Sequence, residues 1–241
     1  MAADRRGRWF DPELVDCLQT ISAPALWASL ETTDLNGTVA AAEPAERAIV
    51  ATDVRLDQIA TAFAWVIDAK SSFTFEHSDR VSALALGAAE RLGFSPDELT
   101  RLRRAALLHD IGKLAVPNAI LDKPGQLTSA EWEVVKQHPA HTLHVLQQVP
   151  VFRELAEDAA NHHERIDGKG YFRGLTGDEL SPTARVLCVA DVADALMSER
   201  PYRAAMPIDE VIALLTKGRG TQFWPEAVDA MAVSLAATPA A

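Results

Sequence analysis

The 241-residue sequence has few cysteines, few aromatic residues and no excess of positive charge. Its two cysteines, Cys17 and Cys188, cannot form a disulfide framework, which favours a reducing compartment. A net charge of −11 disfavours nonspecific binding to DNA, RNA or an anionic membrane. No apolar run approaches the length of a membrane span, and no secretory signal peptide opens the sequence. We therefore expect a cytoplasmic protein without a membrane segment.

Hydrophobic residues make up 48% of the sequence and charged residues 24%, as is typical of a folded globular protein. Alanine, leucine and valine dominate and strand-like alternation is scarce, so the predicted fold class is all-α. A small, polar stretch at 38–44 resembles a linker, and 45–70 has the pattern of one long helix. That helix would pack either on the following domain or on a partner chain, as in a homodimer. We accordingly divide the chain into a helical segment, 1–70, and a second domain, 71–241.

An internal echo links the two ends of the chain. Two similar helix starts could arise by chance. The sharper hypothesis is that the N-terminus is the tail of a second, lost or truncated copy of the C-terminal domain. The six residues that recur at the same spacing are Gly7, Phe10, Pro12, Glu13, Val15 and Asp16, which match Gly220, Phe223, Pro225, Glu226, Val228 and Asp229.

The stretch HDIGK, from His109 to Lys113, follows a short apolar helix. A capping box of Ser95 and Glu98 predicts where this helix starts, and Gly112 is expected to end it. The helical spacing continues to His109, which should therefore point into the core. Asp110 follows it, and a carboxylate at that depth must be paired or bound to a metal.

Other histidines and one more aspartate have the same kind of position, on the inward face or at the end of an apolar helix. Burying so many ionisable groups without partners would be costly, and a metal centre removes that cost. Imidazole and carboxylate suit iron, manganese, zinc or nickel, whereas a structural zinc site would use thiolates. Two divalent metals bridged by Asp110 fit this number of ligands better than one. The set comprises His77, His109, Asp110, His138, His162, His163 and Asp191.

Several spaced motifs then resemble a known family, the HD-GYP phosphohydrolases. They are HSDRV at His77, HDIGK at His109, KQHP around His138, HHERIDGKGY from His162 and VADVADALMSERPYR from Val189. The resemblance implies an HD-domain helical bundle with C-terminal GYP-type helices and loop. It also implies a centre of two or three metals, iron or manganese above all, and hydrolysis of the cyclic dinucleotide cyclic di-GMP to linear pGpG or GMP.

By the same resemblance, the seven residues of the set above correspond to metal ligands. Lys113 corresponds to a lysine near the scissile phosphate, and Asp110 is assigned to the catalytic centre. Gly170 and Tyr171 correspond to the GY of the substrate loop. Further cations could hold the second phosphate of the substrate, although each could equally be a surface residue: Arg165, Lys169, Arg185, Arg200 and Arg203.

Three positions depart from the family pattern. Phe172 replaces the proline of GYP, His141 replaces a common glycine, and Phe73 replaces a glutamate found where a third metal binds. We therefore favour two metals. Two other functions stay open, a di-iron oxygenase and a non-catalytic cyclic-dinucleotide sensor or interaction module. Oxygen consumption would identify the first, and binding without a linear product would identify the second.

Overall fold

The structure is a computed structural model that describes residues 6–7, 11–20, several single positions from 24 to 41, 51–70, 76–199 and 204–237. Contacts divide the chain into two units, Met1–Val50 and Ala51–Ala241. The larger unit thus begins upstream of the boundary predicted after residue 70. None of the helices in the described ranges is long and apolar enough to cross a membrane.

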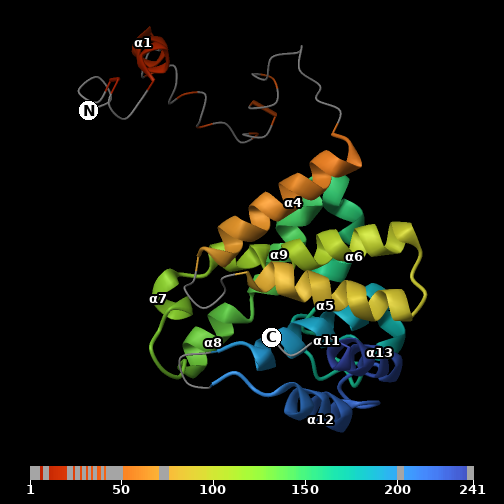
Figure 1. Ribbon diagram of the computed structural model, residues 1–241. Helices are drawn as coiled ribbons and strands as arrows, with labels where there is room; N and C mark the ends of the chain where they lie inside the picture. The colour runs from red at the N-terminus through yellow and green to blue at the C-terminus, as the bar shows by residue number, and fades with distance from the viewer. Residues whose placement is uncertain are drawn as a thin grey trace. The chain divides into compact units, whose positions relative to one another are not determined.

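The fold is all-α, as the sequence predicted. Among the described residues, β-structure is limited to two isolated bridges, Asp167 with Thr176 and Arg219 with Phe223. Figure 1 shows the larger unit as a bundle of helices. The described helices are α1 (Pro12–Thr20), α4 (Asp53–Asp68), α5 (His77–Arg91), α6 (Pro96–Leu108), η2 (Ile111–Ala115), α7 (Asn118–Leu121), α8 (Ser129–Val135), α9 (His138–Gln148), η3 (Pro150–Leu155), α10 (Ala156–Ala160), η4 (Gly177–Glu179), α11 (Pro182–Met197), α12 (Ile208–Gly218) and α13 (Pro225–Ala236).

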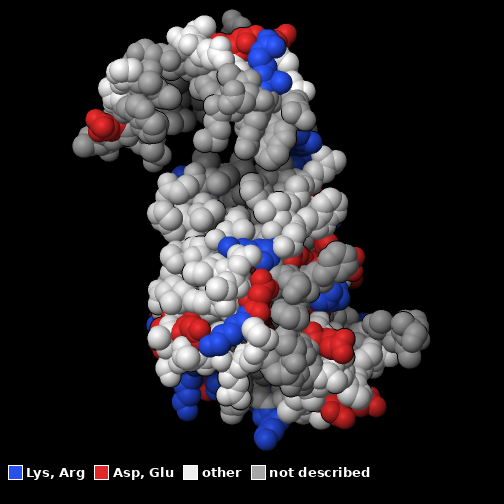
Figure 2. Space-filling model, turned by 90° about the vertical axis from the view of Figure 1, so that its left-hand side faces the viewer, with Lys and Arg blue, Asp and Glu red and all other residues white. Residues whose placement is uncertain are grey.

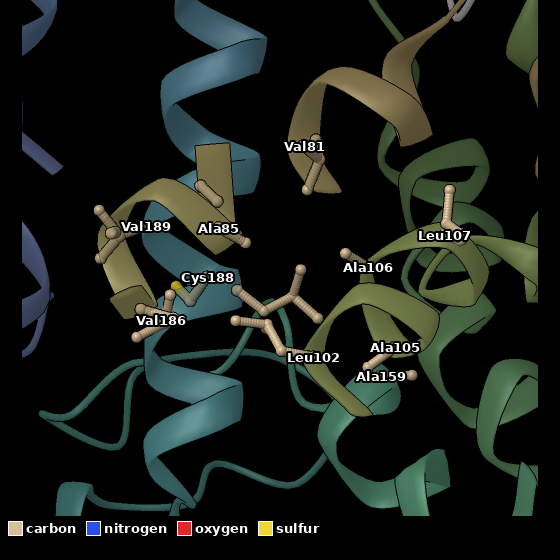
Figure 3. Close-up of a cluster of buried hydrophobic side chains, with 14 of the residues drawn as sticks. Val81, Ala85, Leu102, Ala105, Ala106, Leu107, Ala159, Val186, Cys188 and Val189 are labelled. Carbon is tan, nitrogen blue, oxygen red and sulfur yellow. The ribbon is translucent and has the colours of Figure 1, made fainter. Parts of the chain in front are cut away.

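Helix α5 lies at the centre of the larger unit and packs on α6, α11 and α13. Its buried face is rich in alanine, which lets neighbouring helices approach closely while still removing apolar surface from water. Figure 3 shows the core where α5, α6 and α11 meet. Its fully buried side chains include Val81, Ala85, Leu102, Ala106 and Val189.

Local sequence rules account for most helix starts. The capping box predicted at Ser95 is present, and Thr128 forms a second one; in each, a glutamate three residues later bonds back to the cap. Residues 150–160 form a 3-10 helix, η3, followed by the short α10. Of the long helix predicted over 45–70, the structure describes α4, which Thr52 caps, and residues 45–50 lie outside the described residues.

The described residues of the two copies of the internal echo share three local features. Arg6 forms a two-pronged ion pair with Asp16, at 2.8 and 2.5 Å. Arg219 pairs with Asp229 in the same way, at 2.7 and 2.6 Å. The glycine after each arginine has a left-handed backbone, with φ of 71° in the first copy and 74° in the second. Each copy then starts its helix with a proline.

Candidate metal centre

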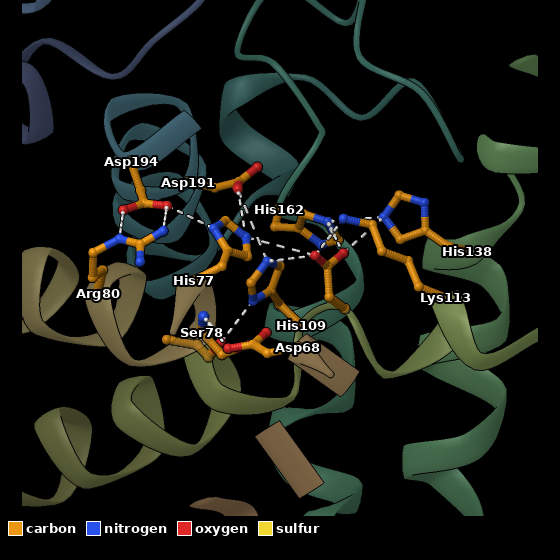
Figure 4. Close-up of polar contacts among 12 residues, drawn as sticks. Asp68, His77, Ser78, Arg80, His109, Lys113, His138, His162, Asp191 and Asp194 are labelled. Carbon is orange, nitrogen blue, oxygen red and sulfur yellow. Dashed lines mark hydrogen bonds and ion pairs between the residues drawn. The ribbon is translucent and has the colours of Figure 1, made fainter. Parts of the chain in front are cut away.

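The carboxylate of Asp110 lies among four imidazoles. Figure 4 labels the four histidines, His77, His109, His138 and His162. Oδ2 of Asp110 is 3.3 Å from Nε2 of His109 and 3.6 Å from Nε2 of His77. Its Oδ1 is 3.3 Å from Nε2 of His138 and 3.7 Å from Nε2 of His162. The two oxygens of one buried carboxylate therefore face two different pairs of histidines.

Asp191 approaches the same cluster from α11. Its Oδ1 is 3.4 Å from Nε2 of His77 and 3.9 Å from Nε2 of His109. Its Oδ2 is 3.6 Å from Nδ1 of His163. The structure thus brings together all seven residues that the sequence placed in the metal set, and they come from elements far apart in the chain.

Backbone contacts aim three of the histidines at this cluster. In each, Nδ1 lies within hydrogen-bond distance of the carbonyl oxygen three residues earlier, which directs Nε2 towards Asp110. The pairs are His109 with Ala106 at 2.6 Å, His138 with Val135 at 2.7 Å and His162 with Ala159 at 2.7 Å. A donating Nδ1–H leaves the Nε2 lone pair free to bind a metal.

His77 is oriented differently, by a carboxylate that sequence reasoning missed. Its Nδ1 lies 2.7 Å from Oδ2 of Asp194, and Arg80 donates to Oδ1 of Asp194 at 2.6 Å. Asp194 could have been found from helical spacing, because it lies one helical turn after Asp191 on the buried face of α11.

The donors present fit divalent metals. His109 Nε2 and Asp110 Oδ1 are buried polar atoms without a hydrogen-bond partner among the described residues. Such orphaned atoms are costly unless an ion completes them. Three groups of donor atoms lie within 4.8 Å of one another: His138, His162 and His163; His77, His109 and Asp191; and His109, Asp110 and His162.

The charges inside the cluster keep its central carboxylate ionised. Burial opposes ionisation of Asp110, but Lys113 and His109 hold the pKa of its carboxyl well below the usual range. Lys113 Nζ lies 2.5 Å from Oδ2 of Asp110. For His109, burial favours the neutral ring, yet the Asp110 charge raises the pKa to about 9. Burial lowers the pKa of His163 to about 3, so that its ring is neutral near pH 7.

Close packing between η2 and α9 holds the HDIGK stretch in place. Gly112 lies inside the 3-10 helix η2, so it does not end α6 in the way that the sequence predicted. A Cβ on Gly112 would lie 1.9 Å from the carbonyl oxygen of His138, and only glycine fits there. The hydroxyl of Thr142 donates to the carbonyl of His109 and accepts the N–H of Gly112. Sequence reasoning had not singled out Thr142.

The GY pair borders the cluster. The ring of Tyr171 packs on that of His163 with centroids 4.5 Å apart. A Cβ on Gly170 would lie 2.4 Å from Cα of Glu164, so the loop can pass that close only with glycine. Buried Glu164 accepts three backbone N–H groups of this loop, from residues 173–175. Phe172 has a φ of 109°, which proline cannot adopt.

The remaining predicted substrate cations do not all face the cluster. Arg165 pairs with Asp167 at 2.6 Å, and Lys169 is exposed. Arg185 donates to the carbonyl oxygens of Leu180 and Gly177, so its guanidinium supports the loop before α11. Arg200 and Arg203 lie outside the described residues, as does Phe73. His141 and His144 are exposed on α9.

Comparison with known proteins agrees with this geometry. The chain is 45% identical over 236 residues to the 3′3′-cGAMP-specific phosphodiesterase 3 of Vibrio cholerae, covering 98% of the chain and 51% of that relative. It is 42% identical over 167 residues to the cyclic di-GMP phosphodiesterase response regulator RpfG of Xanthomonas campestris, covering 68% and 44%. A crystal structure of the cyclic GMP-AMP specific phosphodiesterase V-cGAP3 of V. cholerae matches with a TM-score of 0.57 and 41% identity, over 98% of this chain and 54% of that one.

A bundle of helices around a cluster of histidines and aspartates is the arrangement that the HD class of proteins shares. The family model described as HD domain matches residues 62–226, and the chain belongs to this family. The predicted resemblance to HD-GYP phosphohydrolases is thereby confirmed. The chain spans about half the length of the first relatives that it matches.

Proposed function

We propose that this chain binds two divalent metals and hydrolyses a phosphodiester bond of a cyclic dinucleotide. The observation that carries the proposal is the Asp110 carboxylate, whose two oxygens face separate pairs of imidazoles. Such a carboxylate suits a bridge between two ions, as in two-metal phosphodiester hydrolysis. The metal ligands would be His77, His109, Asp110, His138, His162, His163 and Asp191.

Metals bound here would supply a nucleophilic hydroxide near neutral pH and stabilise charge on the phosphate. The chain's own residues have three further tasks. Lys113, now 2.5 Å from Asp110, can reach a nonbridging phosphate oxygen or protonate the departing 3′ oxygen. Tyr171 borders the cluster and excludes water from one side of it. Lys169 remains the exposed candidate for the second phosphate, with Arg165, Arg185, Arg200 and Arg203 as the other predicted cations.

Cyclic di-GMP is the proposed substrate, with linear pGpG or GMP as product, and 3′3′-cGAMP is the competing one. The names of the relatives include both specificities. On the face seen in Figure 2, acidic and basic side chains are interspersed among the coloured residues, without a continuous basic stripe. That distribution favours a small nucleotide over polymeric DNA or RNA as the ligand.

The test is metal analysis followed by chromatography of the products from both cyclic dinucleotides. Asp110→Ala should lose bound metal and turnover together, since it removes the carboxylate between the two histidine pairs. His144→Ala changes an exposed histidine of α9 and serves as the control, with both properties retained. Turnover by Asp110→Ala at wild-type metal content would defeat the proposal.

A non-catalytic sensor is the second candidate, and Phe172 favours it. Its backbone φ of 109° gives the substrate loop a turn that a GYP proline could not make. A sensor would bind a cyclic dinucleotide in the metal-loaded state without releasing a linear product. The chromatography described above distinguishes the two functions.

We further propose iron or manganese as the metal, a cytoplasmic location and a homodimer through α4. The donor set is imidazole and carboxylate without thiolate, which suits either metal. Helix α4 exposes Val54, Phe63, Trp65 and Val66, and helix faces of this kind are common in dimer interfaces. Metal analysis identifies the bound metal. Sedimentation velocity of the wild type and of Val66→Glu tests the homodimer, because the charge should abolish a dimer that forms through α4.

The echo supports a domain proposal as well. We infer that residues 1–70 comprise a remnant of a preceding HD-like domain followed by the connecting helix. Its support is the repeated arginine–aspartate pair, the left-handed glycine after each arginine and the proline at each helix start. An experimental structure in which residues 6–16 do not superpose on 219–229 would contradict it.

A further inference from the structure

Trp132 lies on the surface of α8, although it stands one helical turn before buried Val135. The residue is 42% exposed. A capping box of Thr128 and Glu131 fixes the start of α8 one turn before it. The indole ring meets the ring of Tyr171 edge-on, with centroids 5.8 Å apart and planes at 71°.

Through Tyr171, the exposed indole is continuous with the metal centre. Tyr171 packs on His163 at 4.5 Å, and its centroid is 6.4 Å from that of His138. Three rings from separate segments therefore form one aromatic surface, which leads from a candidate ligand out to solvent. The outermost ring, that of Trp132, is exposed to solvent and is therefore accessible to a ligand.

The two acidic residues that flank Trp132 in sequence are both paired with lysines. Lys123 pairs with Glu131 at 2.6 Å, and Lys136 pairs with Glu133 at 2.7 Å. The exposed indole itself is a flat, uncharged surface, which suits an uncharged planar ring better than a phosphate. Purine bases stack on such side chains whatever their hydrogen-bonding pattern.

We propose that Trp132 is the stacking surface for a purine base of the nucleotide whose phosphate is bound at the metal centre. The inference rests on the proposed function and adds the residue that receives the base. Stacking of one base on an aromatic side chain corresponds to roughly 5- to 150-fold in affinity. Because Trp132 contacts Tyr171 and none of the seven candidate ligands, the loss should fall on KM and leave kcat and metal content nearly unchanged.

The experiment uses the metal-loaded full chain with cyclic di-GMP and 3′3′-cGAMP. Trp132→Ala should raise KM for the preferred dinucleotide by the factor given above, and Trp132→Phe should recover most of the loss. Trp65→Phe, which changes another exposed tryptophan on α4, is the matched control and should behave as the wild type. Stacking should also quench the fluorescence of the wild type and of Trp65→Phe, but not that of Trp132→Phe.

Quenching that persists in Trp132→Phe, or an unchanged KM in Trp132→Ala, would overturn the inference. Failure of the proposed function looks different, since the wild type would then release no linear product from either dinucleotide. In that case the quenching titration still decides whether a bound cyclic dinucleotide lies on Trp132.

Discussion

Replacing Asp194 with asparagine tests whether the orientation of His77 controls metal affinity. Oδ2 of Asp194 lies 2.7 Å from Nδ1 of His77 and also accepts from Nη2 of Arg80 at 3.1 Å. Oδ1 accepts from Nε of Arg80 at 2.6 Å. Burial opposes ionisation of Asp194, but these two neighbours lower the pKa of its carboxyl. Both oxygens of the carboxylate are therefore used as acceptors.

Asparagine has one acceptor oxygen and one amide nitrogen, so one of these donors must face another donor. Either His77 Nδ1 loses the acceptor that orients its ring, or Arg80 Nε loses its hydrogen bond to residue 194. Removing such an oriented partner of a metal-binding histidine typically costs 10- to 100-fold in metal affinity, which is about 1.4–2.7 kcal/mol. Asp194→Asn should therefore weaken one of the two metal sites by that factor and leave the other unchanged.

The assay is titration of the metal-free chain with Mn²⁺ in competition with a chelating dye. Asp229→Asn is the matched control, because Asp229 forms a similar two-pronged pair with Arg219 but contacts none of the candidate ligands. Equal Mn²⁺ affinities in Asp194→Asn, Asp229→Asn and wild type would refute the role assigned to Asp194.

Three further changes have definite expected outcomes. Gly112→Ala places a methyl group 1.9 Å from the His138 carbonyl and should lower the free energy of unfolding by about 1–3 kcal/mol or more, measured by urea denaturation. Phe172→Gly should be at least as stable as wild type because glycine tolerates φ of 109°, whereas Phe172→Pro should lower both Tm and turnover. Burial raises the pKa of the Asp158 carboxyl above its usual 3.8, so the folded chain binds the carboxyl proton more tightly than the unfolded chain does. The free energy of unfolding therefore falls as the pH rises from 3.8 through the raised pKa. In Asp158→Asn the side-chain amide oxygen can still accept from the Ser181 hydroxyl, but residue 158 no longer titrates. The difference in Tm between this variant and the wild type should therefore grow in favour of the variant as the pH rises over that range, and a constant difference would contradict the prediction.

The positions of the candidate ligands followed from helical spacing. His77 and His138 begin α5 and α9, and His109 ends α6, so each continues a buried face that the apolar pattern defines. Burying a histidine or an aspartate on such an apolar face is costly unless these side chains meet and bind one another or a metal. Convergence itself is a tertiary property. The cost of burying so many ionisable groups indicated it, and the family resemblance then pointed to the same seven residues.

Features that depend on contacts between distant segments could not be predicted from the local pattern. Trp132 has helical spacing compatible with burial, yet α8 is short and its indole meets only the edge of Tyr171. Gly112 looked like a helix end, whereas its real constraint is the approach of α9. In both cases the deciding neighbour lies outside the helix that the pattern described.

Helix α4 is linked to the metal centre by hydrogen bonds, although residues 69–76 separate it from His77 in sequence. Buried Asp68, at its end, accepts the backbone N–H of Ser78 at 3.0 Å and the Ser78 hydroxyl at 2.8 Å, so it fixes the turn that carries His77. Lys70 donates to the carbonyl of Leu114, the residue after Lys113, at 3.0 Å. The end of α4 thus holds both the first histidine and the lysine of the site. A partner that displaced α4 would have to break these hydrogen bonds or move His77 and Lys113 together with the helix. The match to the HD family also includes part of this helix, since it begins at residue 62.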